Sequence, residues 1–596
     1  MAVKLHELFA RDPKKEGLAN DGQARIRNEQ TVQAAHELRA ELSSFVSDGQ
    51  YGRAMERILS GYLKHLTKDR QLAAWISGFY GSGKSHLLKM LGHLWQNTAF
   101  SDGSTPRGLV VGLPAEVAAH LQELDQTAKR HGVGRFAAMG QLPAGSGEFV
   151  RATIASIVLE ARALPAQVQL AEFVFWLREQ GIDGLVRAEV ERAGKNWLRE
   201  LESLYVSPLI AHAVLKALPS FATTEADARR AFAAQFPALK QDVNTNRFVK
   251  VVRAALEENG QLPLTVIVLD EVQQYIADSP QRAADVTEAV EALYTKLDCR
   301  VLVIGAGQSA LSTNTPTLLR LRDRFDVTVE LSDTDVEAVT RKVVLSKKPA
   351  HVAAIKEVLD RHAGEIARHL KSASHLAAKG DDSKIIVTDY PLLPTRRRFW
   401  EECFRAVDAQ GSHSQLRSQL KVLHSCVLEC ADRELGYVIP GDALYTRIAD
   451  KLVNTGVLLN ELFTRIEKLK DGTPIGELRY RTCALVFLIM KLPRETGVDL
   501  GVRATAEVIA DLMIDDLSVP SGPFRNTVAE TLEQLAADGT LMKVGDEYRL
   551  QTTEGAEWDR AFRERVTGLS SQPDEVEAIR SRRFREEAQR AVAEVK

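Results

Sequence analysis

One eight-residue stretch, GFYGSGKS at 78–85, constrains the fold of this chain more than any other. It matches G-x-x-x-x-G-K-[ST] at every fixed position. The apolar run AAWIS (73–77) precedes it, and the amphipathic segment HLLKMLGHLW follows. Glycines let the backbone N–H groups converge on one anion, and the start of a helix adds a favourable dipole. The order strand, loop, helix predicts a phosphate-binding loop in an α/β domain; the alternative is a glycine-rich turn with a chance lysine.

The pattern also predicts what the side chains of the loop do. Lys84 should contact the β- and γ-phosphates of a nucleotide, and the Ser85 hydroxyl should bind Mg²⁺. ATP and Mg²⁺ are therefore the expected cofactors. The residues expected to line the nucleotide are Gly78, Gly81, Ser82, Gly83, Lys84, Ser85 and His86.

A second motif, TVIVLDEVQQY at 265–275, supplies the carboxylates that nucleotide hydrolysis needs. A buried strand would deliver Asp270 to the metal ion, and Glu271 beside it could act as general base on the attacking water. The alternative for Glu271 is a solvated carboxylate at a strand end. Together the two motifs predict a Mg²⁺-dependent ATPase.

Six short apolar runs bounded by turn residues are predicted to be strands, mostly separated by helical patterns. This alternation is typical of a largely parallel sheet covered on both faces. The long gap before the fourth run reads as a helical insertion at about 148–258. The six runs are AAWIS (73–77), LVVGL (109–113), RFAAM (135–139), LTVIVLD (264–270), RVLVIGAG (300–307) and VTVEL (327–331).

Polar residues after the later strands are candidates for completing the site. Gln308 follows the strand at 300–307 and could sense the γ-phosphate or position water, or it is a loop amide. LLRLRDRFDVTVEL resembles the R-x-x-x-R-F box of initiator-type AAA+ ATPases, which implies that Arg320 and Arg324 enter the site of a neighbouring subunit, where a guanidinium neutralises transition-state charge. Their alternative is a solvated basic helix end. SQLRSQLKVLHS (414–425) resembles the lid helix of the same class, which implies that Arg417 contacts the nucleotide from above; the alternative is an arginine on a surface helix.

The remainder of the chain is expected to be mainly helical, with β-prone residues at 379–400. The pattern at 501–553 is helix, turn, helix and a hairpin around Gly545, which describes a winged helix. We therefore expect an N-terminal helical segment (1–70), an ATPase core (71–332), a lid (333–435), a linker (436–500), a winged-helix domain (501–556) and a charged tail (557–596). The uncapped tail suggests a longer natural chain.

Charge and composition limit the partners. The net charge of −3 gives no general attraction to nucleic acid or anionic membranes. The second winged-helix segment carries Arg525 but also Glu530, Glu533 and Asp538, so protein contact is at least as good a prediction as DNA contact. TRRRFW (395–400), the densest basic cluster, reads as a solvated face. Five scattered cysteines, no signal peptide and no membrane-length apolar run predict a cytoplasmic protein.

The motifs at 78–85, 265–275 and 318–331, with Gln308, a helical lid and a winged helix, resemble the initiator (ORC) branch of AAA+ ATPases over about 70–553. That resemblance implies an AAA+ core whose arginines Arg320 and Arg324 act between subunits of a homo-oligomer. The N-terminal third, especially LHELFARDPKKEGLANDGQARI and WISGFYGSGKSHLLKMLGHLW, resembles the BrxC/PglY P-loop ATPases of bacterial BREX and Pgl phage-defence systems. That family implies partners such as a methyltransferase and a phosphatase-like protein.

The leading hypothesis is thus an ATP-driven oligomeric switch in phage defence. A replication initiator or helicase loader is the second hypothesis, and it would bind DNA through the winged helix. The third is a nucleotide-stabilised scaffold with negligible turnover.

Overall fold

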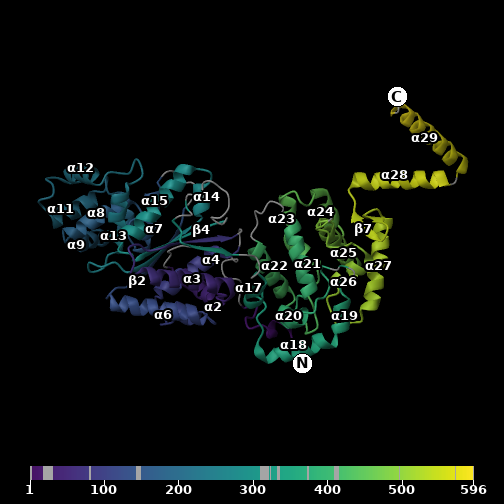
Figure 1. Ribbon diagram of the computed structural model, residues 1–596, viewed down its shortest axis with the longest axis horizontal. Helices are drawn as coiled ribbons and strands as arrows, with labels where there is room; N and C mark the ends of the chain where they lie inside the picture. The colour runs from purple at the N-terminus through teal and green to yellow at the C-terminus, as the bar shows by residue number, and fades with distance from the viewer. Residues whose placement is uncertain are drawn as a thin grey trace. The chain divides into compact units, whose positions relative to one another are not determined.

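A computed structural model describes residues 3–15, 17, 31–78, 82–142, 149–308, 321, 324–331, 336–371, 373, 375–407, 415–495, 497–570 and 572–594. The chain divides into two compact units. We call Leu18–Val344 with Ser412–Lys421 the sheet unit. We call Met1–Gly17, Leu345–Gly411 and Val422–Lys596 the helical unit (Figure 1).

Five parallel strands form the centre of the sheet unit, in the order β2-β3-β4-β1-β5. Strand β4 lies between β1 and β3, so the segments that carry the two main motifs flank a common neighbour. This arrangement confirms the predicted parallel α/β core. The strands are β1 (Ala73–Gly78), β2 (Arg135–Gln141), β3 (Leu264–Asp270), β4 (Val301–Gly307) and β5 (Val327–Leu331).

In β1 to β4 both faces of the sheet are buried, because successive side chains enter different cores, whereas the edge strand β5 exposes Thr328 and Glu330. In β3, Val266 and Val268 pack in one cluster and Ile267 and Leu269 in the other. Helices α3 (Gly49–His65), α4 (Lys84–Gln96) and α6 (Ala115–Arg130) contribute to the first cluster. Helices α7 (Val150–Ala161), α13 (Thr245–Leu256) and α15 (Pro280–Lys296) contribute to the second. Double coverage explains why the strands read as continuous apolar runs.

One strand prediction, LVVGL at 109–113, is wrong. Residues Pro106–Leu109 form the short helix α5, in which proline occupies the first turn and the Thr105 hydroxyl accepts a hydrogen bond from the Gly108 N–H at 3.3 Å. Val111 is 81 % exposed. The helix start signals outweigh the apolar run, in which Val110 is buried but Val111 and Gly112 are exposed.

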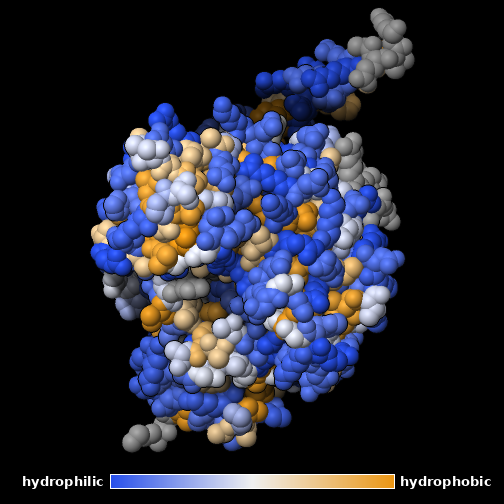
Figure 2. Space-filling view, turned by 90° about the vertical axis from the view of Figure 1, so that its left-hand side faces the viewer, coloured by the Kyte–Doolittle hydropathy of each residue, from blue (hydrophilic) through white to orange (hydrophobic). Residues whose placement is uncertain are grey.

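The long segment between β2 and β3 is helical as predicted. Phe173, Trp176, Phe221 and Phe232 pack around one another inside it, with ring centroids 5.0–5.8 Å apart. Figure 2 looks onto this end of the sheet unit, whose hydrophilic surface is interrupted by groups of apolar residues. Between α7 and α13 the helices are α8 (Val168–Glu179), α9 (Asp183–Arg192), α10 (Trp197–Glu202), α11 (Pro208–Ala217) and α12 (Glu225–Gln235).

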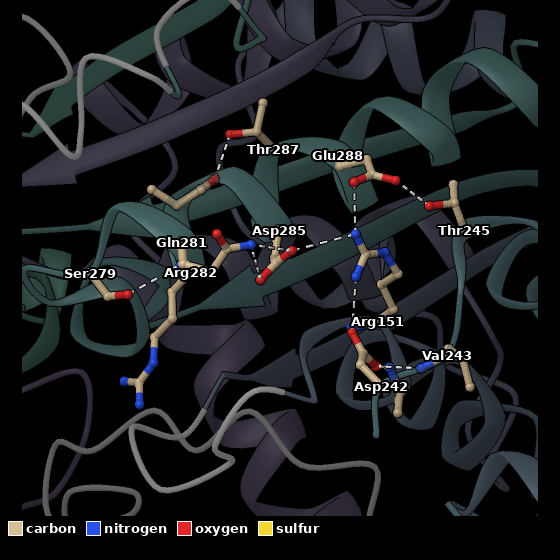
Figure 3. A network of polar contacts seen from close by, with 12 residues as sticks. Arg151, Asp242, Val243, Thr245, Ser279, Gln281, Arg282, Asp285, Thr287 and Glu288 are labelled. Carbon is tan, nitrogen blue, oxygen red and sulfur yellow. Dashed lines mark hydrogen bonds and ion pairs between the residues drawn. The ribbon is translucent and has the colours of Figure 1, made fainter. Parts of the chain in front are cut away.

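A polar network fixes the insertion where it leaves and rejoins the core. Asp242, before α13, accepts hydrogen bonds from the backbone N–H groups of Arg151 and Ala152 at the start of α7, both at 3.0 Å. The Arg151 guanidinium in turn pairs with Asp242 at 3.2 Å and with Glu288 of α15 at 2.8 Å (Figure 3). The three helices next to the sheet are therefore tied together at one point.

The described residues of the helical unit form helices and one two-stranded hairpin. Its apolar run CALVFLIM lies buried in α25 (Pro474–Lys491). Within the described part of the chain, no helix has both the length and the apolar character needed to cross a membrane. Its other helices are α1 (Leu5–Leu8), α18 (Pro349–Arg361), α19 (Ala363–Arg368), α20 (Asp382–Asp389), α21 (Pro394–Val407), α23 (Ala443–Asn454), α24 (Asn460–Glu467), α26 (Ala506–Met513), α27 (Ser521–Ala537), α28 (Thr553–Ser570) and α29 (Pro573–Glu594).

The arginine cluster at 395–400 is not the solvated face that the sequence predicts. Arg396 is fully buried and donates hydrogen bonds to the carbonyl oxygens of Ile439, Asp511 and Ile514. Arg397 pairs with the buried Asp389 at 2.8 Å, and Arg398 with Asp382 at 2.8 Å. The arginines therefore bind acceptors of their own unit, which excludes Arg396 and Arg397 from a nucleic-acid surface.

The predicted order of helix, turn, helix and hairpin is present at 506–550. Helix α26, helix α27 and the antiparallel strands β6 (Leu541–Val544) and β7 (Glu547–Leu550) follow one another. Arg525, the candidate DNA contact on α27, is instead held by Asp511 at 2.5 Å and Glu365 at 2.8 Å, with its side chain 11 % exposed. Lys543 pairs with Glu533 at 2.5 Å. This part of the surface at 506–550 therefore offers DNA little unpaired positive charge.

Candidate nucleotide-binding site

The phosphate loop lies between β1 and α4 as the motif requires. Gly83 has φ +85° and caps the start of α4 in the left-handed region, which favours glycine. A Cβ at Gly78, where φ is +154°, would come within 2.7 Å of both the Leu331 carbonyl oxygen and the Ser82 hydroxyl. These two positions therefore need glycine for close backbone approach. Gly81 lies outside the described residues.

Lys84 is the first residue of α4, and its ammonium group folds back on the loop. Its Nζ donates a hydrogen bond to the Gly78 carbonyl oxygen at 2.6 Å. Burial lowers the pKa of Lys84 to about 8, against the opposing influence of Asp270. A phosphate at this place would favour the charged form, so anion binding and lysine protonation are coupled.

Ser85 and Asp270 meet although 185 residues separate them in the sequence. The Ser85 hydroxyl donates a hydrogen bond to Asp270 Oδ2 at 2.6 Å, and Asp270 is 2 % exposed. A hydroxyl and a carboxylate side by side provide the kind of oxygen ligands that Mg²⁺ takes together with nucleotide phosphates and water. The pair therefore fits a Mg²⁺ ion, as the sequence predicts.

Glu271 follows Asp270 in an unusual backbone conformation. Its φ of +58° places it in the left-handed region, and its N–H donates to Asp270 Oδ1 at 2.9 Å. Burial, and then the negative charge of Asp270, raise the pKa of Glu271. Left-handed backbone at a non-glycine residue is energetically costly and is found mostly where the surrounding structure enforces it. A carboxylate with a raised pKa beside a metal site suits a general base.

Gln308 lies at the end of β4, between the strands that carry the other motifs. Its backbone N–H donates to the Gln273 side-chain carbonyl at 2.6 Å, and the residue is exposed. Gln273, which the sequence reasoning missed, belongs to α14 (Val272–Ile276), directly after Glu271. Its side chain therefore links the turn after Asp270 to the end of β4.

Of the three predicted arginine side chains, the structure describes that of Arg324 alone. Arg320 lies outside the described residues. Arg324 donates from Nε to Glu291 of α15 in its own chain at 2.8 Å. Arg417 belongs to α22 (Gln415–Glu429), but its side chain is outside the described part. The roles of all three remain predictions.

Contacts from the N-terminal helices to the phosphate loop and α4 were not anticipated. The ring of His86, predicted to line the nucleotide, packs edge-on against Phe45 with centroids 5.4 Å apart, and burial lowers its pKa. Glu41 of α2 (Val32–Ser44) pairs with Lys89 of α4 at 2.6 Å, both nearly buried. The Tyr51 hydroxyl donates to the Ser82 carbonyl at 2.8 Å. Only the amphipathic pattern of these helices is visible in the sequence.

Comparison with known proteins adds little. No protein-family model matches the chain. Among solved structures, the chain is similar to that of the Aeropyrum pernix ORC1 protein in complex with DNA, with 14 % sequence identity, 90 % of this chain and 96 % of that chain covered, and a TM-score of 0.28. A likeness this distant does not extend to function.

Proposed function

We propose that the chain binds and hydrolyses MgATP as an AAA+ switch. The observation that carries the proposal is the meeting of Lys84, the Ser85–Asp270 pair and Glu271 at one edge of the parallel sheet. Lys84 and the loop N–H groups would hold the phosphates, Ser85 and Asp270 would hold Mg²⁺, and Glu271 would take a proton from water. Bound Mg²⁺ would neutralise charge that develops on the phosphoryl oxygens.

We further propose that the active form is a homo-oligomer, in which Arg320 and Arg324 act in a neighbour's site. The support is the R-x-x-x-R-F sequence before β5 and the position of Arg324 on the sheet unit, half-exposed beside Glu291. Domain closure on ATP would then change the subunit interface and so license partner proteins.

One experiment tests both proposals. ATP turnover and solution mass are measured with and without ATP for wild type, Lys84→Ala, Glu271→Gln and Arg320→Ala. Turnover should vanish in Lys84→Ala because binding is lost. Glu271→Gln should stay ATP-bound and inactive, whereas background turnover in wild type itself would favour a nucleotide-stabilised scaffold. If Arg320→Ala still forms the nucleotide-dependent oligomer and turns over ATP at the wild-type rate, Arg320 does not act in a neighbouring subunit's site.

The biological setting that we propose is a cytoplasmic BREX or Pgl phage-defence system, with a methyltransferase and a phosphatase-like protein as partners. The resemblance of the N-terminal third to BrxC/PglY proteins supports it. Phage plating on cells that carry the complete defence system should rise to the undefended level with Lys84→Ala. Unchanged protection would contradict a role of ATP in defence.

A replication initiator or helicase loader is the second candidate, favoured by the helix, turn, helix and hairpin order at 506–550. Its winged helix should bind duplex DNA in a salt-dependent way. Because Arg525 is enclosed by two carboxylates, that binding would have to use other residues. Salt-sensitive duplex binding by the full chain would favour this candidate over the switch.

A further inference from the structure

Tyr51, near the start of α3, contacts the phosphate loop from outside the motif. The side chain belongs to a residue that is 6 % exposed, and its hydroxyl donates to the Ser82 carbonyl oxygen at 2.8 Å. The same hydroxyl would lie 2.6 Å from a Cβ at Gly83. The loop backbone therefore runs directly over the tyrosine hydroxyl, with no room for a side chain between them.

This hydrogen bond determines the direction of one loop N–H group. A trans peptide is planar, so the N–H of Gly83 points opposite to the carbonyl of Ser82. With the carbonyl held by Tyr51, the Gly83 N–H is directed to the other side of the loop. Gly83 is also the left-handed residue before α4, and successive N–H groups in such a turn form an anion-binding concavity.

The tyrosine is presented by a firmly attached element. Helix α3 packs on the sheet through Ile58, Leu59 and Tyr62, which are fully buried. The preceding helix α2 is fixed to α4 by the Glu41–Lys89 ion pair at 2.6 Å. The position of the hydroxyl is therefore set by the core and not by the loop that it contacts.

We infer that Tyr51 is a positioning residue for nucleotide phosphates, and that it holds the Ser82–Gly83 peptide in the orientation that accepts an anion. This inference rests on the proposed ATP site. It adds a residue outside the motif, 31 positions before Ser82. Loss of the hydroxyl leaves the loop able to rotate this peptide, so binding of phosphates must then restrict it at a cost in affinity.

The chain offers a matched control on the same helix. The Tyr62 hydroxyl donates to the Arg300 carbonyl oxygen at 2.9 Å, away from the phosphate loop. Tyr51→Phe and Tyr62→Phe each remove one hydroxyl that donates to a backbone carbonyl, so a purely structural role predicts equal effects on ATP binding. A positioning role predicts that only the first affects ATP.

The test measures MgATP dissociation constants and melting temperatures of the full chain for wild type, Tyr51→Phe, Tyr62→Phe and Lys84→Ala. Tyr51→Phe should weaken MgATP binding by about 3- to 10-fold, the net worth of one hydrogen bond, while Tyr62→Phe leaves it unchanged. Both variants should melt at similarly lowered temperatures.

Any other outcome contradicts either the inference about Tyr51 or the proposed ATP site. Wild-type affinity in Tyr51→Phe, or equal weakening in both tyrosine variants, overturns the inference while the ATP site stands. Absence of MgATP binding by wild type, or binding that Lys84→Ala leaves intact, overturns the proposed function and the inference with it.

Discussion

The sheet unit and the helical unit both bury positively charged side chains, but they surround those charges differently. In the helical unit, burial would lower the pKa of Arg525, yet hydrogen bonds and charges of Glu365 and Asp511 outweigh it and raise the pKa. In the sheet unit, the effect of burial on Lys84 exceeds that of the nearby Asp270 charge, and the pKa of Lys84 falls to about 8. The first charge is stabilised by the fold, whereas the second would gain stabilisation from a bound anion.

The partners of each cation separate these two cases better than local sequence does. TRRRFW has more positive charge than GFYGSGKS, yet Arg396 binds three carbonyl oxygens of its own unit. Lys84 donates to a carbonyl of the loop that would surround a phosphate. Burial also lowers the pKa of Arg396, to about 10, so a depressed pKa alone does not mark a ligand site. The buried cation beside a carboxylate and a glycine-rich loop is the better candidate for ligand binding.

The largest effect is expected at Glu271, the proposed base of the sheet unit. Glu271→Gln keeps the shape but removes the proton acceptor, so ATP turnover should fall by about 100- to 10,000-fold. MgATP affinity should stay near that of wild type. Steady-state turnover with equilibrium binding checks this, and a variant that hydrolyses ATP at the wild-type rate would remove Glu271 from the mechanism.

The next effect tests the structural cation. Arg525→Ala leaves Asp511, 1 % exposed in its side chain, and Glu365 without the cation between them. The helical unit should lose roughly 3 kcal/mol of unfolding free energy, as expected for breaking a buried pair. Chemical denaturation measures this, with Lys543→Ala, which breaks an exposed pair, as the control that changes little. Equal destabilisation by both variants would contradict the contrast between the units.

The third prediction concerns pH. The pKa of Lys84 is about 8 without ligand, and the charged form binds phosphate, so affinity should be highest below pH 8. Above that value MgATP affinity should fall by up to about tenfold per pH unit, since one proton must be taken up. Lys84→Arg keeps its charge and should show a flat profile from pH 7 to about pH 10. A flat profile in wild type would place the controlling charge elsewhere.

The smallest effect is expected at the ion pair of Arg324 and Glu291. If Arg324 acts in a neighbouring subunit, it must leave Glu291, and Glu291→Gln should ease that step. Turnover should then rise by no more than about fivefold, the worth of a partly exposed pair, and only at protein concentrations that support the oligomer. A rise that is independent of protein concentration would contradict action between subunits.

The core and the site motifs could be predicted because their signals are local. Five of the six predicted strands are present, and the doubly covered ones among them read as largely apolar runs. The strand predicted at LVVGL is wrong because composition alone does not reveal burial, and Val111 is exposed. The β-prone residues IIVT at 385–388 likewise lie in the helix α20. Tertiary context overrides β-propensity in both segments.

The contacts that set the site geometry could not be predicted, because they join distant parts of the chain. Ser85 and Asp270 could be paired only through knowledge of the motifs. Tyr51 and Gln273 belong to no motif, and their partners at Ser82 and Gln308 are fixed by the packing of helices on the sheet. Arg396 is buried against acceptors more than 40 residues away in the sequence. Arg525 pairs with Glu365, which lies 160 residues away.

The most direct test of the central claim is the shift in melting temperature produced by saturating MgATP. Wild type and Lys342→Ala, which changes an exposed lysine of the same sheet unit, should be stabilised equally. Lys84→Ala should show no shift, because the phosphates lose their buried cation. A shift in Lys84→Ala as large as in wild type would contradict the assignment of this sheet edge as the ATP site.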